Sequence, residues 1–304
     1  MSVRSTSNLN GSVSPRPGRR VRDPAGVVYS VAILSTDLNS PRPLIIGHRG
    51  ASAVAPENTL AAFARALDEG ADGVELDVRL ARDGVPVVIH DATLRRTGLR
   101  EGIVAEMTSP ELGQIDVGRW FNRANPQLTH KDYARQFVPT LDQVFRFFNE
   151  DANREAIIYV ELKTDEAEQS SNELAHSVGQ CINEFEFRSR VVVVSFNLNA
   201  LAVSKQIDGT ICTGALFEPR RTARKLMSTR RMIATTIEIG ADEILFHRLI
   251  ATSKAVHCAL ENQLSPVVWT VNHARWMRRA NLPGLQAVIT NNPAEIAAAR
   301  GLEL

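Results

Sequence analysis

The sequence predicts an α/β protein built as a (β/α)8 barrel of the TIM type. From residue 44 onward, short apolar segments typical of buried strands alternate with longer segments that have helical periodicity. This alternation is typical of a parallel sheet whose strands are joined by helices. The part of the chain that follows residue 43 is also close in length to the ~250 residues of an average barrel of this type.

Nine segments have the β-branched and apolar composition of strands. In chain order they are residues 44–48, 73–80, 85–90, 157–163, 191–196, 213–217, 243–247, 266–271 and 287–290. The helix-length segments between them include residues 59–69, 172–183 and 293–300. Nine strands are one too many for the barrel, and Arg82-Asp83-Gly84, which joins the second to the third, is too short for a crossover helix. We therefore expect an irregular barrel, with a hairpin or another helix-free connection at this point.

Two parts of the chain are predicted to depart from the barrel pattern. Residues 1–43 are rich in Ser, Arg, Pro and Gly, and we expect a disordered tail before a barrel domain that spans residues 44–304. Residues 91–156 are too long for an ordinary barrel loop. They contain two helix starts of the capping-box type, at Thr108 and Thr140. We expect a small insertion here that lies over the mouth of the barrel and narrows access to it.

The composition argues against several classes of protein. The formal net charge is +1, which gives no general attraction for nucleic acids or anionic membranes. No apolar segment approaches the ~18 residues of a membrane span, and no signal peptide is recognisable. The three cysteines are far apart and lack metal-binding spacing, so we expect reduced thiols and a cytoplasmic protein. The expected partner is a small molecule, and no feature of the sequence predicts an oligomeric state.

Glu75 and Asp77 lie two positions apart on the second predicted strand, so both side chains point to the same side of the sheet. On the inside of a barrel the two carboxylates would repel each other unless a cation joined them. Glu161 adds a third carboxylate, on the face of its strand that also carries Lys163. Oxygen ligands without cysteine favour a hard divalent cation, Mg²⁺ or Ca²⁺, over zinc. The alternative is a set of solvated charges at strand ends, or an ion pair with Lys163.

Two histidines end predicted strands, His48 the first and His90 the third. The carboxyl ends of barrel strands form the mouth at which active sites lie. Histidine titrates near neutral pH, so one imidazole can take a proton while the other gives one to a leaving group. Arg49 and Lys163 add positive charge suited to an anion, and we favour a phosphate group. The alternative for either cation alone is a surface position.

Three further residues are weaker candidates. Glu57 comes just before the first predicted helix and is a candidate for orienting the metal site. For Asn58, which follows it, a supporting role competes with that of a helix N-cap, for which Asn is well suited. Trp269 is a candidate for contact with the apolar part of a substrate, or else for a place in the core.

Taken in chain order, these segments resemble the glycerophosphodiester phosphodiesterases. The resemblance is carried by His48-Arg49-Gly50, Pro56-Glu57-Asn58-Thr59, Glu75-Leu76-Asp77-Val78, His90-Asp91, Glu161-Leu162-Lys163, Ser195-Phe196 and Trp269-Thr270-Val271-Asn272. It runs from about residue 44 to the end of the chain. It implies a barrel related to the phosphoinositide-specific phospholipases C, with one divalent cation, often Mg²⁺ or Ca²⁺. It also implies that the two histidines are an acid–base pair, that the three carboxylates are metal ligands and that Arg49 and Lys163 hold the phosphate.

The implied activity is metal-dependent hydrolysis of glycerophosphodiesters to glycerol 3-phosphate and an alcohol. The glycerol hydroxyl next to the phosphorylated carbon would attack phosphorus and form a cyclic phosphate that water then opens; direct attack by water is the other route. Two alternatives are a related phosphodiesterase for lysophospholipids or phosphoinositides, and a non-catalytic relative that binds phosphate esters. In one departure, Asn291 stands where the family often has Asp, a position that bears on a structural hydrogen bond.

Overall fold

A computed structural model describes residues 42–164, 168–219, 227–280 and 282–301, together with two short strands, β1 (Arg20–Arg22) and β2 (Val28–Ser30). These two strands pair with each other in antiparallel fashion. Most of residues 1–43 lie outside the described part of the chain, so the disordered tail stays a prediction.

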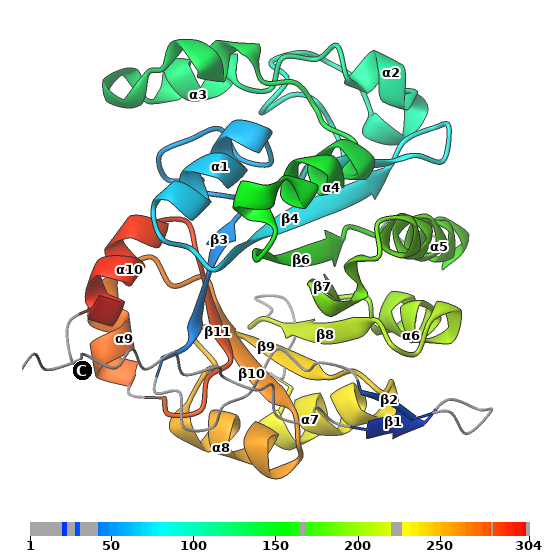
Figure 1. The fold of residues 1–304 in the computed structure, drawn as a ribbon, viewed down its shortest axis with the longest axis vertical. Helices are drawn as coiled ribbons and strands as arrows, with labels where there is room; N and C mark the ends of the chain where they lie inside the picture. The colour runs from blue at the N-terminus through cyan, green and yellow to red at the C-terminus, as the bar shows by residue number, and fades with distance from the viewer. Residues whose placement is uncertain are drawn as a thin grey trace, which may run out of the picture.

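Eight parallel strands close into a barrel, which confirms the predicted fold class (Figure 1). The strands are β3 (Leu44–His48), β4 (Gly73–Leu80), β6 (Ile157–Leu162), β7 (Val191–Ser195), β8 (Cys212–Phe217), β9 (Glu243–His247), β10 (Ser265–Trp269) and β11 (Ala287–Thr290). Hydrogen bonding follows this order around the ring. The ring closes because β3 pairs with β4 on one side and with β11 on the other.

The extra predicted strand lies outside the ring. β5 (Pro86–Val88) pairs in antiparallel fashion with the end of β4. Gly84 makes the turn between them with a φ of +77°, a conformation that glycine adopts without strain. The predicted hairpin is therefore confirmed. One more hydrogen bond, from Ile89 N to Asp77 O, brings the next residue, His90, to the carboxyl half of β4.

Helices surround the ring and bury the outward-facing side chains of its strands (Figure 1). They are α1 (Leu60–Asp68), α5 (Glu168–Glu184), α6 (Leu198–Ile207), α7 (Thr229–Glu238), α8 (Ser253–Glu261), α9 (Ala274–Ala280) and α10 (Pro293–Gly301). On β4, for example, Val74, Leu76 and Val78 are fully buried in the largest apolar cluster. Within the described residues, no helix is both long enough and apolar enough to cross a membrane.

Residues 91–156, called the insertion below, form short helices between β5 and β6. They are η1 (Val104–Glu106), α2 (Ser109–Leu112), α3 (Arg119–Ala124), η2 (Pro126–Leu128), η3 (Lys131–Arg135), α4 (Leu141–Asn149) and η4 (Asp151–Asn153). Capping boxes begin α2 at Thr108 and α4 at Thr140, as predicted. An apolar cluster that includes Val87, Leu94 and Leu112 joins the insertion to the β4–β5 hairpin.

The inside of the barrel is filled by apolar side chains from alternate strand positions, such as Ile46 and Leu245. One polar pair is enclosed among them. The Tyr159 hydroxyl donates a hydrogen bond of 3.0 Å to Glu243 Oε2, and both side chains are buried. Burial raises the pKa of the Glu243 carboxyl to about 8. Glu243 is therefore mainly protonated at neutral pH, so the barrel interior need not hold a buried charge.

Glu243→Gln is expected to reduce the pH dependence of stability. In the unfolded chain Glu243 ionises near the ordinary pKa of ~4.3, whereas in the folded chain burial raises the pKa to about 8. Between these values the folded chain binds more protons, so the free energy of unfolding falls as the pH rises. The amide cannot ionise and still accepts from Tyr159. Urea unfolding at pH ~6 and ~8.5 should show a fall that is smaller by about 2–3 kcal/mol in the variant; equal falls would contradict this account.

Candidate active site

The three carboxylates singled out in the sequence meet on two neighbouring strands. Asp77 of β4 lies opposite Glu161 of β6, and Glu75 precedes Asp77 by two positions on the same face of β4. One oxygen atom from each side chain lies within 4.8 Å of the others. The exposed fractions of Glu75, Asp77 and Glu161 are 2%, 0% and 7%. Three buried carboxylates at this spacing require compensating positive charge.

Burial and mutual repulsion disturb the ionisation of this cluster. Burial, with the charges of Asp77 and Glu161, raises the pKa of Glu75 well above its ordinary value. Burial also raises the pKa of Glu161, to about 7. For Asp77 burial acts in the same direction, but Lys163 and Arg49 outweigh it and hold the pKa below its ordinary value. Glu75 Oε1 is buried and finds no hydrogen-bond donor among the described residues. The donor set therefore fits a hard divalent cation.

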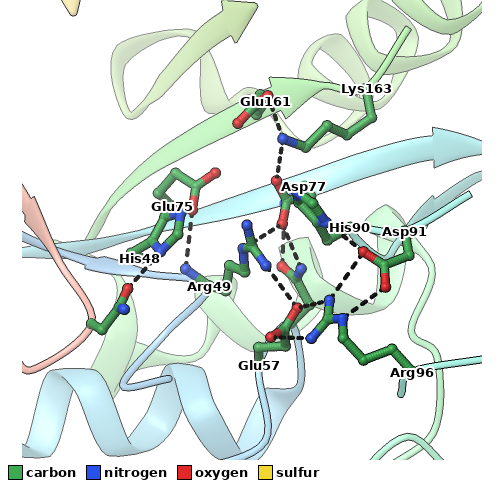
Figure 2. A network of polar contacts seen from close by, with 12 residues as sticks. His48, Arg49, Glu57, Glu75, Asp77, His90, Asp91, Arg96, Glu161 and Lys163 are labelled. Atoms are coloured by element: carbon green, nitrogen blue, oxygen red, sulfur yellow. Dashed lines mark hydrogen bonds and ion pairs between the residues drawn. The ribbon is translucent and has the colours of Figure 1, made fainter. Parts of the chain in front are cut away.

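Two cations of the chain lie against these carboxylates (Figure 2). Arg49 Nε is 3.0 Å from Asp77 Oδ2, and the Arg49 backbone N donates to Glu75 Oε2 at 3.0 Å. Lys163 Nζ is 3.0 Å from Asp77 Oδ1 and also contacts Glu161. The ion pair with Lys163 that was the alternative to a metal site therefore exists. It does not account for the whole cluster, because it does not reach Glu75 Oε1.

His48 ends β3, and its imidazole is held from the neighbouring strand of the ring. Its Nδ1 lies 2.6 Å from Oδ1 of Asn291, the residue that follows β11. An amide oxygen only accepts, so Nδ1 carries the hydrogen and Nε2 is left 3.9 Å from Glu75 Oε2. Burial, reinforced by the charge of Arg49, lowers the pKa of His48 to about 4. The position of Asn291 was expected to take part in a structural hydrogen bond. This hydrogen bond is present, and its partner is His48.

His90 follows β5 and is held by its own neighbour in the chain. Its Nδ1 lies 2.6 Å from Asp91 Oδ1 (Figure 2). Burial lowers the pKa of His90 below its ordinary value, although the charge of Asp77 opposes this effect. A carboxylate accepts the Nδ1 hydrogen, so Nε2 is the nitrogen left to exchange a proton.

Glu57 and Asn58 lie in the loop before α1. Thr59 is the N-cap of this helix, because its hydroxyl accepts from the first turn, so the N-cap alternative for Asn58 is wrong. Asn58 instead donates to Asp77 Oδ2 at 2.7 Å and accepts from Asp77 N at 3.2 Å. Its backbone is left-handed, with a φ of +57°, which Asn adopts more readily than most residues. Glu57 accepts from Arg49 Nη1 at 2.9 Å and so bears on the carboxylates only through Arg49.

A cavity of about 290 Å³ brings most of these groups together. The two histidines, both cations, Glu75 and Glu161 line it together with Phe196, Glu218 and Trp269. The half-buried Trp269 ring packs edge-on against Phe196 at a centroid distance of 5.5 Å, and its Nε1 donates to Leu245 O at 3.3 Å. Trp269 therefore combines the two alternatives, since it packs on its neighbours and also presents a surface to the cavity.

Three other residues near the cavity were not assigned a role in the site from the sequence. Phe196 and Glu218 directly follow β7 and β8, so their position at a strand end was the available signal. Arg96 binds Glu57 across 39 residues of sequence, and no local pattern indicates such a contact.

Known proteins match most of this chain. The model of the glycerophosphoryl diester phosphodiesterase family matches residues 48–295. A glycerophosphodiester phosphodiesterase of Caldanaerobacter subterraneus subsp. tengcongensis is 31% identical over 83% of this chain and 95% of that protein. One of Bacillus subtilis is 30% identical over 84% and 86% of the two chains. The solved structure of an Oleispira antarctica phosphodiesterase in complex with the product sn-glycerol-3-phosphate superposes with a TM-score of 0.71 at 25% identity, covering 84% of this chain and 96% of the other. The chain therefore belongs to the glycerophosphoryl diester phosphodiesterase family.

Proposed function

We propose that this protein hydrolyses glycerophosphodiesters to glycerol 3-phosphate and an alcohol. The observation that supports this best is that one cavity is lined by two histidines, by two cationic side chains and by Glu75 and Glu161 of the buried carboxylate cluster. Membership of the family agrees with it. So does the product sn-glycerol-3-phosphate bound to the Oleispira antarctica relative, since this is the product that the proposal requires.

Arg49 and Lys163 would bind the phosphate group. Both line the cavity, and their side chains are only 17% and 14% exposed, so water screens their charges poorly. An arginine can bind two phosphate oxygens at once. The two cations would offset the negative charge that gathers on the phosphoryl oxygens in the transition state. Trp269 offers a flat apolar surface to the carbon atoms of the substrate.

Glu75, Asp77 and Glu161 would hold one divalent cation, Mg²⁺ or Ca²⁺. Buried carboxylates without a sulfur ligand suit either of these hard cations. When bound, the cation would supply further positive charge to the phosphoryl group. Asn58 supports this site, because its two hydrogen bonds fix the orientation of Asp77.

His48 and His90 would share the proton transfers. In a glycerophosphodiester a free hydroxyl lies next to the phosphorylated carbon. One imidazole removes the proton of this hydroxyl, whose oxygen attacks phosphorus, while the other imidazole protonates the departing alcohol. Water then opens the resulting cyclic phosphate with the two roles reversed. Each Nδ1 is held by a neighbouring side chain, which leaves Nε2 for the exchange of protons.

Purified protein supplied with Mg²⁺ or Ca²⁺ is expected to release glycerol 3-phosphate from glycerophosphodiesters. A coupled assay of glycerol 3-phosphate, run over several head groups with each cation, measures this release. An analogue without the hydroxyl next to the phosphorylated carbon should stay intact, because it cannot form the cyclic phosphate; its full turnover would support direct attack by water. If every glycerophosphodiester stayed intact, a non-catalytic relative that binds phosphate esters would become the better account.

A phosphodiesterase that acts on lysophospholipids or phosphoinositides is the second candidate. It is favoured by exposed apolar side chains on the insertion, which include Leu99, Ile103, Leu128 and Phe137. Apolar surface of this kind suits an acyl chain or a membrane contact. Hydrolysis of glycerophosphocholine without hydrolysis of long-chain lysophosphatidylcholine would exclude this candidate.

We also place the protein in the cytoplasm, because Cys181, Cys212 and Cys258 are all free thiols. The catalytic unit would be residues 44–304, with residues 1–43 as a tail outside it. Recovery of the protein in an oxidising compartment after cell fractionation would contradict the proposed location.

A further inference from the structure

Arg96, near the start of the insertion, binds two carboxylates at once (Figure 2). Its Nε and Nη2 donate to the two oxygens of Asp91 at 2.7 and 3.1 Å. Its Nη1 and Nη2 donate to the two oxygens of Glu57 at 2.8 and 2.7 Å. Paired contacts of this kind fix the direction of a carboxylate as well as its distance. The guanidinium therefore determines how both acidic side chains are oriented.

Each of these carboxylates in turn holds a residue that lines the cavity. Asp91 binds His90 Nδ1 at 2.6 Å, and Glu57 binds Arg49 Nη1 at 2.9 Å. The contacts form one continuous chain from His90 through Asp91, Arg96 and Glu57 to Arg49. Arg96 does not belong to the residues that line the cavity, so it reaches the reaction only through its partners.

We propose that Arg96 is a positioning residue that sets the orientation of His90 and Arg49 together. This inference rests on the proposed function, in which His90 exchanges a proton and Arg49 binds the phosphate. Proton transfer needs a donor and an acceptor within hydrogen-bond reach, and small displacements are costly. Arg96 binds the carboxylates that hold His90 and Arg49. It would thereby keep the imidazole at a fixed distance from the phosphate that Arg49 binds.

Acidic and basic side chains alternate along these contacts, from Asp91 through Arg96 to Glu57. A guanidinium at the centre can therefore bind a carboxylate on each side. The hydrogen bonds from Arg96 lower the pKa of Asp91 to about 2. Burial acts to raise the pKa of Glu57, but Arg96 and Arg49 outweigh it, so the pKa lies below its ordinary value. Both carboxylates are therefore ionised and accept hydrogen bonds. A lysine at this position would keep the charge but lacks the planar fork that binds two carboxylates.

The insertion supports Arg96 from the other side. The guanidinium carbon lies 5.7 Å from the centre of the Trp120 ring. Trp120 packs edge-on against Phe121 at a centroid distance of 5.9 Å, and Phe121 is buried with Ala62 of α1. The insertion is thus anchored on the helix that follows Glu57. It would contribute to catalysis through this contact.

Arg96→Gln is expected to lower kcat/KM for a glycerophosphodiester by ~10–100-fold, the loss typical when a partner that orients an active-site ligand is removed. The matched control is Arg95→Gln, which should behave as the wild type. Arg95 is the adjacent arginine, and within the described part of the chain it pairs with Glu101 on the surface, where the side chains are 71% and 79% exposed. Arg96→Lys should recover part of the loss. Circular dichroism and melting temperatures show whether each variant is folded.

Two further measurements separate positioning from support of the fold. The loss in a double variant that combines Arg96→Gln with Asp91→Asn should be smaller than the product of the two single losses, because Arg96 acts on His90 through Asp91. The limb of the pH profile of kcat/KM that His90 sets should move to higher pH in Arg96→Gln, since the charge of Asp91 is then no longer offset. The other charged groups that act on His90, namely Asp77, Arg49 and Lys163, are unchanged in this variant.

A folded Arg96→Gln variant with the kcat/KM of Arg95→Gln would overturn the inference. The inference would also be overturned if the loss of kcat/KM in the double variant equalled the product of the two single losses and the pH profile of Arg96→Gln were unshifted. Failure of the proposed function would look different, because the wild type and Arg95→Gln would then also leave every glycerophosphodiester intact, and the inference would fail with it.

Discussion

His48→Ala and His90→Ala are each expected to lower kcat by ~10²–10⁴-fold, the usual contribution of one general acid or base. With a single imidazole, either the attacking hydroxyl keeps its proton or the alcohol departs without one. KM should change less than kcat, because Arg49 and Lys163 still bind the phosphate. Steady-state kinetics with glycerophosphocholine and a divalent cation measure both quantities.

The matched control for these variants is His257→Ala. His257 is an exposed histidine on α8 whose partner is Glu261, and it does not line the cavity. Its replacement should leave kcat unchanged, and all three variants should keep the circular dichroism spectrum of the wild type. If either His48→Ala or His90→Ala kept more than a small fraction of the activity, the acid–base pair would be refuted.

Glu161→Gln is expected to abolish tight binding of the divalent cation and, with it, most of the activity. The change removes the charge of one of the three clustered carboxylates and leaves a side chain of the same size. Calorimetric titration with Mg²⁺ and Ca²⁺ measures binding without any turnover. In the wild type the cation should also raise the melting temperature, because it binds the folded chain and not the unfolded one. EDTA should reverse this rise and stop turnover until the cation is restored.

Glu161 is a better target for this test than Asp77. Asp77 is fully buried between Arg49 and Lys163, so Asp77→Asn would leave two cations short of a partner and destabilise the fold itself. Among the residues that the structure describes, Glu161 forms an ion pair with Lys163 alone. Asp142→Asn, which changes an exposed carboxylate on α4, is the control. Wild-type cation affinity in Glu161→Gln would show that the cation binds elsewhere.

The barrel could be predicted because its strands are short, buried and apolar, a pattern that parallel sheets require. The predicted limits of β3, β4, β9 and β11 agree with the structure. β5 has the same composition as a strand of the ring, and only the short turn at Gly84 indicated that it lies outside. The carboxylates could be assigned to one site because alternation along a strand fixes the face of each side chain.

Contacts between distant side chains could not be predicted in this way. Asn291 and His48 are 243 residues apart, and they meet because β11 and β3 close the ring. The contact between Arg96 and Glu57 depends on the path of the insertion, whose short helices carry no periodic pattern long enough to place them. Pattern and periodicity describe local structure, whereas these contacts follow from the closed fold.

The mouth of this barrel is divided into two arcs. Groups for charge and proton transfer come from β3, β4, β6 and the β5 hairpin, whereas Phe196, Glu218 and Trp269 come from the ends of β7, β8 and β10. Under the proposed function, substitutions in the second arc would change which alcohol fits while they leave the residues of the first arc in place. Such a separation would let related enzymes release different alcohols with the same bond-breaking chemistry.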